Sequence, residues 1–161
     1  THNNSPDDPD YRAFLSRLWE PLKESLEPGT SGLDYGSGPG PTLHLMAQED
    51  GFSCTHYDPF FHPDESVLKG RYDFITCSET AEHFHHPDRE FKRLADLLRP
   101  GGVLGIMTSM HTGNMNFADW HYHRDPTHVS FYSGRTFQFF AEKFGFKGVE
   151  FHGPSVVLLH K

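Results

Sequence analysis

Three glycines that alternate along the chain, Gly36, Gly38 and Gly40, could place backbone amides against a ligand. Glycine has no Cβ and accepts a positive φ, so the backbone can turn sharply there and approach a bound molecule. The glycines follow a short segment that ends in Asp34-Tyr35 and precede a predicted helix, whose first amides favour polar or anionic groups. Such a loop between strand and helix builds nucleotide-type sites in open α/β sheets. The alternative is a tight turn that holds no ligand.

The spacing of this loop differs from the dinucleotide fingerprint, which reads G-x-G-x-x-G. Counted from Gly36, the third glycine of that fingerprint would fall where this chain has Pro41. An acid, Asp58, ends the next predicted strand, and a carboxylate there can accept hydrogen bonds from two ribose hydroxyls. The alternative is that Asp58 caps the turn before Pro59.

Histidines are the other residues that could do chemistry, and the chain has 13 of them. Imidazole titrates near neutral pH, so it can take a proton or orient a substrate. Two groups follow predicted strands, and the carboxyl ends of parallel strands meet at one rim of a sheet. The histidines expected to act as catalytic residues at this rim are His83, His121, His123 and His128.

The segment Trp120–Tyr132 has three interpretations. It forms the wall of an acceptor site, or it binds a metal through His121, His123 and either Asp125 or His128. The third interpretation is a structural loop with a turn at Asp125-Pro126-Thr127. We favour the acceptor-site wall and assign no metal ligands.

Composition restricts the partners. The formal net charge is −8, without a run of basic residues, which argues against nucleic acid because phosphate binding needs clustered Lys and Arg. No apolar run reaches the roughly 18–20 residues that a membrane span needs. The two cysteines, Cys54 and Cys77, form neither a C-x-x-C motif nor a disulfide framework. We therefore expect a cytoplasmic protein with a small-molecule substrate and no membrane partner; the oligomeric state is left open.

The chain is expected to form one domain over residues 11–161. Residues 1–10 are polar and contain two prolines, which predicts a disordered lead-in. Because the first residue is Thr1 rather than Met, we expect a fragment or a processed product. With 15 Phe among 161 residues, the core is predicted to be rich in Phe.

The predicted elements alternate between helix and strand. Apolar spacing predicts a helix over 11–26 with a kink or break at Pro21. The remaining helices are predicted at 41–50, 88–98 and 133–144, and the strands at 32–35, 52–57, 72–77, 103–108, 146–151 and 155–160. The alternation predicts a parallel sheet with helices on both faces. The link Gly153-Pro154 is so short that the last two strands must pair antiparallel.

Four landmarks carry a family resemblance. The loop D-x-G-x-G-x-G at 34–40 resembles motif I of the class I S-adenosylmethionine-dependent methyltransferases. Residues 72–84 resemble the fourth-strand motif of that family with its E-H-F segment, and Leu-Leu-Arg-Pro-Gly-Gly at 97–102 resembles its signature before the fifth strand. The segments D-Y-R-x-F-L at 10–15 and H-Y-x-x-D-P-T-H-V at 121–129 resemble a small bacterial group within the methyltransferase type 23 branch.

The resemblance implies a Rossmann-like methyltransferase fold: a mostly parallel central sheet with helices on both faces and a C-terminal antiparallel hairpin. It implies S-adenosyl-L-methionine as cofactor. The residues it assigns to cofactor binding are Asp34, Gly36, Ser37, Gly38, Gly40, Asp58, Pro59, Phe60, Cys77 and Glu79. Tyr11 could fold over the cofactor, or it packs on the sheet.

The chain departs from the family pattern between its second and fourth strands. Residues 59–71 leave little room for a third strand and helix, so we expect that strand to be short or missing. The adenine would then stack on Phe60 and Phe61; the alternative is that both rings pack in the core at the sheet edge. The implied activity is methyl transfer to an unidentified small or medium acceptor; the alternative is a non-catalytic cofactor- or metal-binding domain of the same fold.

Overall fold

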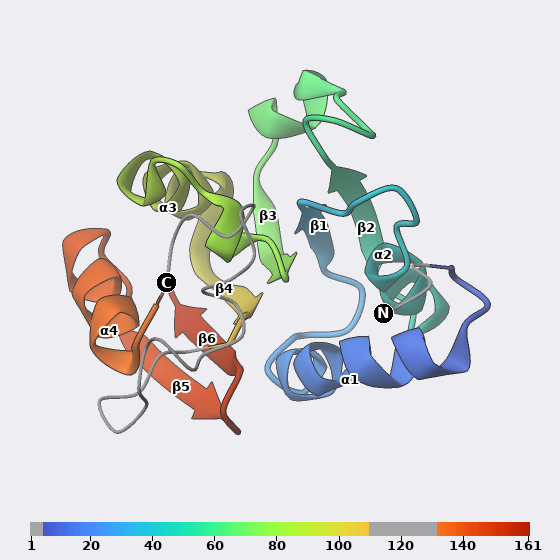
Figure 1. Cartoon of the computed structure of the whole chain (residues 1–161). Coiled ribbons are helices and arrows are strands. Elements are labelled where there is room, and N and C mark those ends of the chain that lie inside the picture. The colour runs from blue at the N-terminus through green and yellow to red at the C-terminus, as the bar shows by residue number, and fades with distance from the viewer. Residues whose placement is uncertain (1–4, 110–131) are drawn as a thin grey trace.

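The computed structural model describes residues 5–109 and 132–161. Its centre is a six-stranded sheet in the order β2-β1-β3-β4-β6-β5 (Figure 1). The strands are β1 Ser31–Tyr35, β2 Ser53–Tyr57, β3 Tyr72–Ser78, β4 Leu98–Met107, β5 Gly148–His152 and β6 Val156–His160. β1 to β4 pair in parallel, whereas β6 is antiparallel to both β4 and β5. The mostly parallel sheet with a C-terminal antiparallel hairpin is therefore confirmed.

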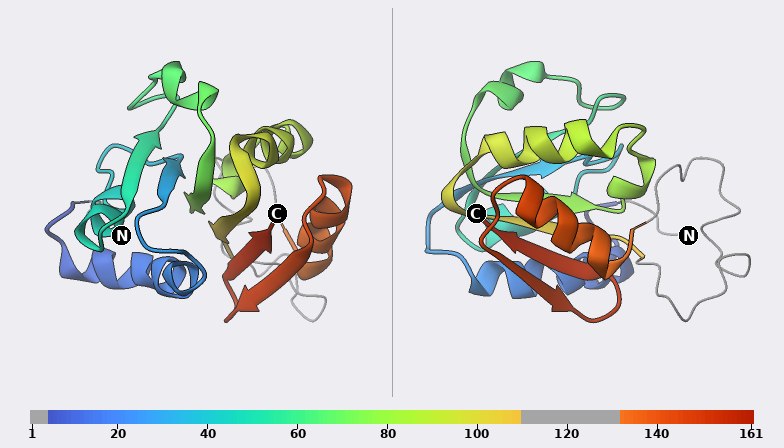
Figure 2. Two further views of the ribbon diagram at one scale, coloured as in Figure 1. Left: turned by 180° about the vertical axis from the view of Figure 1, so that it is seen from behind. Right: turned by 90° about the vertical axis from the view of Figure 1, so that its left-hand side faces the viewer.

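Four α-helices cover the two faces of this sheet. They are α1 Pro9–Glu24, α2 Leu43–Glu49, α3 Pro87–Leu97 and α4 Gly134–Lys143, joined by the short 3-10 helices η1 Glu65–Lys69 and η2 Ala81–His83. Side chains of α1 and α2 share one buried cluster, and side chains of α3 and α4 share the other. Figure 2 shows α1 and α3 on opposite sides of the strands. Helices on both faces are therefore confirmed.

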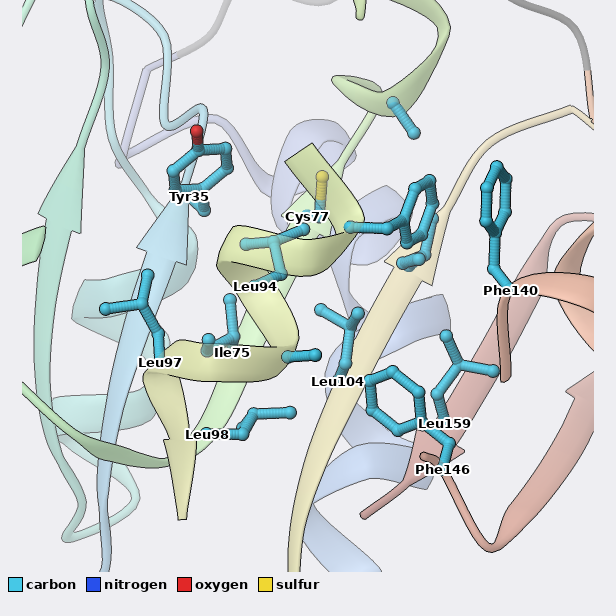
Figure 3. Close-up of a cluster of buried hydrophobic side chains, with 14 of the residues drawn as sticks. Tyr35, Ile75, Cys77, Leu94, Leu97, Leu98, Leu104, Phe140, Phe146 and Leu159 are labelled. Carbon is cyan, nitrogen blue, oxygen red and sulfur yellow. The ribbon is translucent and has the colours of Figure 1, made fainter. Parts of the chain in front are cut away.

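The buried cluster under α3 and α4 is rich in aromatic rings (Figure 3). Phe91 of α3 stacks on Phe140 of α4 with ring centroids 4.5 Å apart, and its edge meets Tyr132 and Phe137. Ser133 begins α4 with a capping box, and Gly145 follows its end with a positive φ of 80°. The aromatic content of the sequence thus joins helices that alone would be marginal.

The first helix differs from its prediction. It begins at Pro9, because the Asp8 carboxylate accepts hydrogen bonds from the amides of Asp10 and Tyr11 and caps the helix. It also runs through Pro21 as one helix rather than two. Proline removes one helical hydrogen bond, but Leu18 and Leu22 on either side are fully buried against the sheet, and this packing keeps the last turn in place.

The segment between β2 and β3 forms no strand. Asp58 and His62 exchange two backbone hydrogen bonds of 3.0 and 2.9 Å and close a turn, and η1 follows. β2 is consequently an edge strand, and the expectation of a short or missing third strand is confirmed.

β4 begins earlier than predicted. Residues 99–102, which precede the predicted strand at 103–108, form its bulged start: Leu98 pairs with Tyr72, and Val103 pairs with Phe74 after a shift of register. Gly102 fits there because a Cβ would lie within 2.8–2.9 Å of the carbonyl oxygens of Arg99 and Asp73. The bulge lets the chain turn directly from α3 into the sheet.

Candidate functional site

A cavity of about 180 Å³ opens at the carboxyl ends of β1 and β3 and is walled by α1 and α2. Its lining residues are Tyr11, Phe14, Leu15, Asp34, Gly36, Ser37, Gly38, Thr42, Leu43, Ser78 and Glu79. Ligand pockets usually measure about 300–1,000 Å³, so a ligand of ordinary size would extend beyond this cavity. The rest of such a ligand would lie on the neighbouring surface.

The glycine loop reaches its shape through contacts with two strands. The amides of Gly36 and Ser37 both donate to the carbonyl of Tyr57 at the end of β2, at 2.8 and 3.1 Å. Gly36 has a φ of 78°, and its carbonyl accepts a hydrogen bond from the Thr80 hydroxyl at 3.0 Å. A Cβ on Gly36 would lie 2.2–2.8 Å from the Thr80 side chain. Glycine is therefore required at this position by both conformation and space.

Asp58 joins this loop to the turn after β2. One carboxylate oxygen accepts from the amide of Gly38 at 2.9 Å, and the other accepts from the amides of Phe60 and Phe61 at 2.9 and 3.1 Å. Asp58 does not line the cavity, and its side chain caps the turn, which is the alternative that the sequence left open. A carboxylate has about four acceptor positions, so one is left for a ligand hydroxyl.

Asp34 is the acid inside the cavity. It is 4% exposed and accepts a hydrogen bond of 3.0 Å from the Thr76 hydroxyl. Burial, with a smaller contribution from the negative charge of Asp58, raises the pKa of Asp34 to about 7. The pKa of Tyr11 is raised to about 12, first by burial and then by the charges of Asp34 and Glu79. This part of the cavity therefore favours a cation.

Glu79 lines the cavity in a strained conformation. It has a φ of 51°, and within residues 5–109 and 132–161 it is the sole non-glycine with a positive φ. Its amide donates to the carbonyl of Met107 at 2.8 Å, which fixes the chain where β3 and β4 end. Backbone strain of this kind gathers at functional sites.

Several predicted cofactor residues lie outside the cavity lining. Gly40 is the last residue of the glycine loop, and Pro59 and Phe60 come directly after Asp58; none of the three lines the cavity. The side chain of Phe60 is 86% exposed. Phe61, its neighbour, is 54% exposed. Since Asp58 holds the amides of both Gly38 and Phe60, this exposed aromatic pair lies beside the cavity as an open surface.

The prediction for Cys77 needs correction. Its side chain is fully buried on the α3 side of the sheet, in the hydrophobic cluster with Leu94 and Leu104 (Figure 3), and burial raises the pKa of its thiol. Successive side chains of a strand point to opposite faces, and Asp34 and its partner Thr76 lie on the cavity side. Cys77 is therefore a core residue rather than a cofactor contact.

The histidines are only partly described. His83 is exposed at the end of η2 and does not line the cavity. His121, His123 and His128 lie outside the described residues, so the interpretations of their segment stay predictions. Among residues 5–109 and 132–161, no group of three His, Cys, Asp or Glu side chains could hold a metal ion.

The lining also contains residues that the sequence did not single out: Phe14, Leu15, Thr42, Leu43 and Ser78. Phe14 lies one helical turn after Tyr11, on the same face of α1. This spacing could have predicted that Phe14 lines the cavity together with Tyr11. The side chain of Glu82 is also buried, and its carboxylate accepts a hydrogen bond of 2.8 Å from the Thr108 hydroxyl.

Comparison with known proteins identifies the family. A family model described as a methyltransferase domain, of type 23, matches residues 7–150. The chain therefore belongs to this methyltransferase family, and the family predicted from the sequence is confirmed.

Curated relatives match a part of the chain. The ubiquinone biosynthesis O-methyltransferase of Shewanella pealeana is 31% identical over 78 residues, which are 48% of this chain and 33% of the relative. That of Escherichia coli O127:H6 is 30% identical over 83 residues, or 52% and 35%. The matches thus span about a third of the length of these relatives.

Solved structures share the fold. A SAM-dependent methyltransferase from Archaeoglobus fulgidus is similar with a TM-score of 0.65 at 16% identity, covering 94% of this chain and 99% of that one. Phosphoethanolamine N-methyltransferase 2 of Haemonchus contortus, solved with S-adenosyl-L-methionine, gives 0.65 at 20% identity, covering 92% and 40%. The Rossmann-like methyltransferase fold is therefore confirmed.

Replacing Gly36 by Ala should disrupt the loop. The new Cβ would collide with Thr80 and would stand at a φ of 78°, so we expect S-adenosylmethionine affinity to fall at least tenfold, as measured by calorimetric titration. Gly29→Ala is the matched control, since Gly29 has a φ of 76° with no atom near its Cβ. It should cost about 1–2 kcal/mol of stability and leave the affinity unchanged. Equal affinities in both variants would contradict this role of Gly36.

Replacing Asp34 by Asn should stabilise the protein at high pH. The folded-state pKa of Asp34 is raised from 3.8 to about 7, so the folded state holds the proton more tightly than the unfolded state. Stability is then lost as pH rises through this window. At pH 8 the free energy of unfolding of Asp34→Asn should exceed that of the wild type by about 1–3 kcal/mol, with little difference at pH 4, as measured by urea unfolding. A constant difference at both pH values would contradict the assignment.

Proposed function

We propose that the cavity binds S-adenosylmethionine and that the protein transfers its methyl group to a small-molecule acceptor. The observation that carries the proposal is the cavity beside the glycine loop, whose lining contains the two acidic residues Asp34 and Glu79; burial first, and then their charges, raises the pKa of Tyr11. The two carboxylates fit a ligand that bears a positive charge on both its ammonium and its sulfonium group. Membership of the methyltransferase family supports the same ligand.

Each part of the site has a role in holding this cofactor. Asp34 and Glu79 would bind the cationic amino-acid end, while the loop around Gly36 and Gly38 would present backbone amides and close approach. The remaining acceptor position of Asp58 would take a ribose hydroxyl. Phe60 and Phe61 would offer exposed faces for the adenine, in place of contacts from the missing third strand.

The cofactor supplies an activated methyl group, and the protein supplies alignment and charge. Direct displacement needs a base if the acceptor arrives protonated. We assign this role to His83, which is exposed on η2 directly after the carboxyl end of β3. The naming of the curated relatives as O-methyltransferases supports an oxygen acceptor.

The setting is part of the proposal. Two buried cysteines carry free thiols, which fits a reducing compartment such as the bacterial cytoplasm, and the curated relatives named above are bacterial. The net charge of −8 supports a small-molecule partner over nucleic acid. In the described residues no helix is long and apolar enough to cross a membrane.

A second candidate is a non-catalytic domain that binds the cofactor without transferring its methyl group. The missing third strand favours this candidate, because it leaves the adenine surface at Phe60 open and 86% exposed.

Calorimetric titration of S-adenosylmethionine and of NAD, followed by transfer of a labelled methyl group to catechols and other phenols, tests the proposal. We expect micromolar binding of S-adenosylmethionine alone, and turnover on an oxygen acceptor. Binding without turnover on any acceptor would favour the non-catalytic domain. Absence of binding would contradict both candidates.

His83→Gln tests the base in the same assay. It should lower kcat by about 10²–10⁴-fold and leave cofactor affinity unchanged. His85→Gln is the control, because His85 is an exposed neighbour on the same segment. Equal kcat values in the two variants would remove His83 from the mechanism.

A further inference from the structure

Three histidines from different segments meet beside the cavity, and the proposed function uses none of them. His44 comes from α2, His56 from β2 and His62 from the turn that follows β2. The ring centroids of His44 and His56 are 4.3 Å apart, and those of His56 and His62 are 4.5 Å apart. We call these residues the histidine cluster.

Each ring of the histidine cluster has a buried nitrogen without a hydrogen-bond partner in the described part of the chain. These atoms are Nδ1 of His44, Nδ1 of His56 and Nε2 of His62. An unpaired polar atom in this position is tolerable on a neutral ring, but a proton on it would be a buried charge without a partner. The rings of His44 and His56 are tilted by 38°, and the ring of His62 meets that of His56 edge to face at 85°. No group of three metal-ligating side chains occurs among the described residues.

No group in the described part of the chain forms a hydrogen bond with the three unpartnered ring nitrogens. Asp58, next to His62, has both carboxylate oxygens bound to backbone amides. The thiol of Cys54 on β2 is buried, and its pKa is raised, so it is neutral. Four further charged groups on α1, β1 and the segment after the turn have partners of their own: Arg12 with Glu49, Lys23 with Asp50, Asp34 with Thr76 and Asp64 with Ser66.

The direction of the titration follows from this environment. Burial, then the charges of His56 and His62, lowers the pKa of His44 to about 4, and burial and His62 lower the pKa of His56. The unfolded state, with an ordinary histidine pKa near 6.5, therefore binds more protons between pH 6.5 and 4. The stability that neutral His44 and His56 contribute is complete above this window and is lost as pH falls through it.

The histidine cluster joins the two segments that carry the cofactor site. His62 exchanges two backbone hydrogen bonds with Asp58, and Asp58 holds the amide of Gly38 in the loop. His44 follows Leu43, which lines the cavity at the start of α2. α2 lies against β2 (Figure 1), so ring contacts between His44, His56 and His62 fasten the Asp58 turn to the helix beneath it.

We propose that the histidine cluster is a proton-operated latch on the cofactor site: neutral rings hold the Asp58 turn against α2, and protonation in mildly acidic solution releases it and weakens cofactor binding. The second half of this statement rests on the proposed function. The first half concerns the protein without cofactor and is tested independently.

The test follows backbone amide exchange by NMR in the protein without cofactor. The reporting amides are those of Gly38, Asp58 and His62, each in a hydrogen bond that the latch maintains. Between pH 7.5 and 5.0 their protection, corrected for intrinsic exchange, should fall at least tenfold. The amide of Thr108, bonded to the carbonyl of Ser155 at the far side of the sheet, is the internal control. Unchanged protection of the turn would overturn the proposal.

His44→Leu is the informative variant, because leucine fills a similar volume with an apolar side chain that cannot take a proton. The loss of protection at low pH should shrink at least threefold in this variant, whereas exposed His85→Leu should behave as the wild type. A full loss of protection in His44→Leu would overturn the latch. If His44→Leu does not fold, ring-proton titration of the wild type decides: midpoints of His44 and His56 below 6 support the latch, and midpoints at about 6.5 overturn it.

The link to the cofactor is tested by titrating S-adenosylmethionine at pH 7.5 and 5.5. The ratio of Kd at pH 5.5 to Kd at pH 7.5 should be at least threefold larger in the wild type than in His44→Leu. Because Asp34 titrates in both proteins, comparing the two ratios cancels its contribution. Equal ratios would overturn the link while the amide data stand. Absence of binding at both pH values would contradict the proposed function, and the amide exchange would then decide the latch alone.

Discussion

The site depends on one carboxylate, that of Asp58, which binds three backbone amides at once. Two of these belong to the turn after β2, and the third belongs to Gly38 of the glycine loop. A charged group that is 8% exposed would be costly without partners, and three amide donors offset that cost. Because the loop amides at 36 and 37 also bond the end of β2, the first two strands, the loop and the turn become one rigid corner. Because the third strand is missing, this corner forms the edge of the sheet, and within residues 5–109 and 132–161 no further strand lies beyond β2.

The cavity inside this corner is built at the expense of stability. Asp34 is buried with one hydroxyl partner, which raises its pKa to about 7, and Glu79 occupies a left-handed conformation at a φ of 51°. Neither feature benefits an empty protein, whereas under the proposed function a cationic ligand would restore the charge of Asp34 and use the orientation of Glu79. Proteins commonly accept such costs at binding sites and offset them by packing elsewhere. Here the aromatic stack of Phe91 and Phe140 and the buried face of α1 supply that packing.

Much of this could be predicted from sequence because the signals are local. Strand-helix alternation, the Gly153-Pro154 link and the glycine loop each follow from short segments, and they led to the parallel sheet, the hairpin and the position of the cavity. What escaped prediction depends on tertiary contacts. The pleat of β3 turns Cys77 into the core, a choice that one residue of register reverses. Asp58 faces amides rather than an open site, and the start of β4 is set by its bulge against Tyr72. The ring contact of His44 with His56 forms only because α2 packs against β2. The spacing of residues along the sequence does not predict this contact.

The role of the Asp58 carboxylate can be measured by titrating S-adenosylmethionine into the wild type and Asp58→Asn at pH 8. An amide side chain retains one acceptor oxygen, so it cannot hold Gly38 and the turn together. Asp64→Asn is the matched control, because Asp64 caps η1 through Ser66 in the same manner but away from the cavity. We expect at least tenfold weaker binding for Asp58→Asn alone, with both variants folded by circular dichroism. Equal affinity of Asp58→Asn and the wild type would contradict this role.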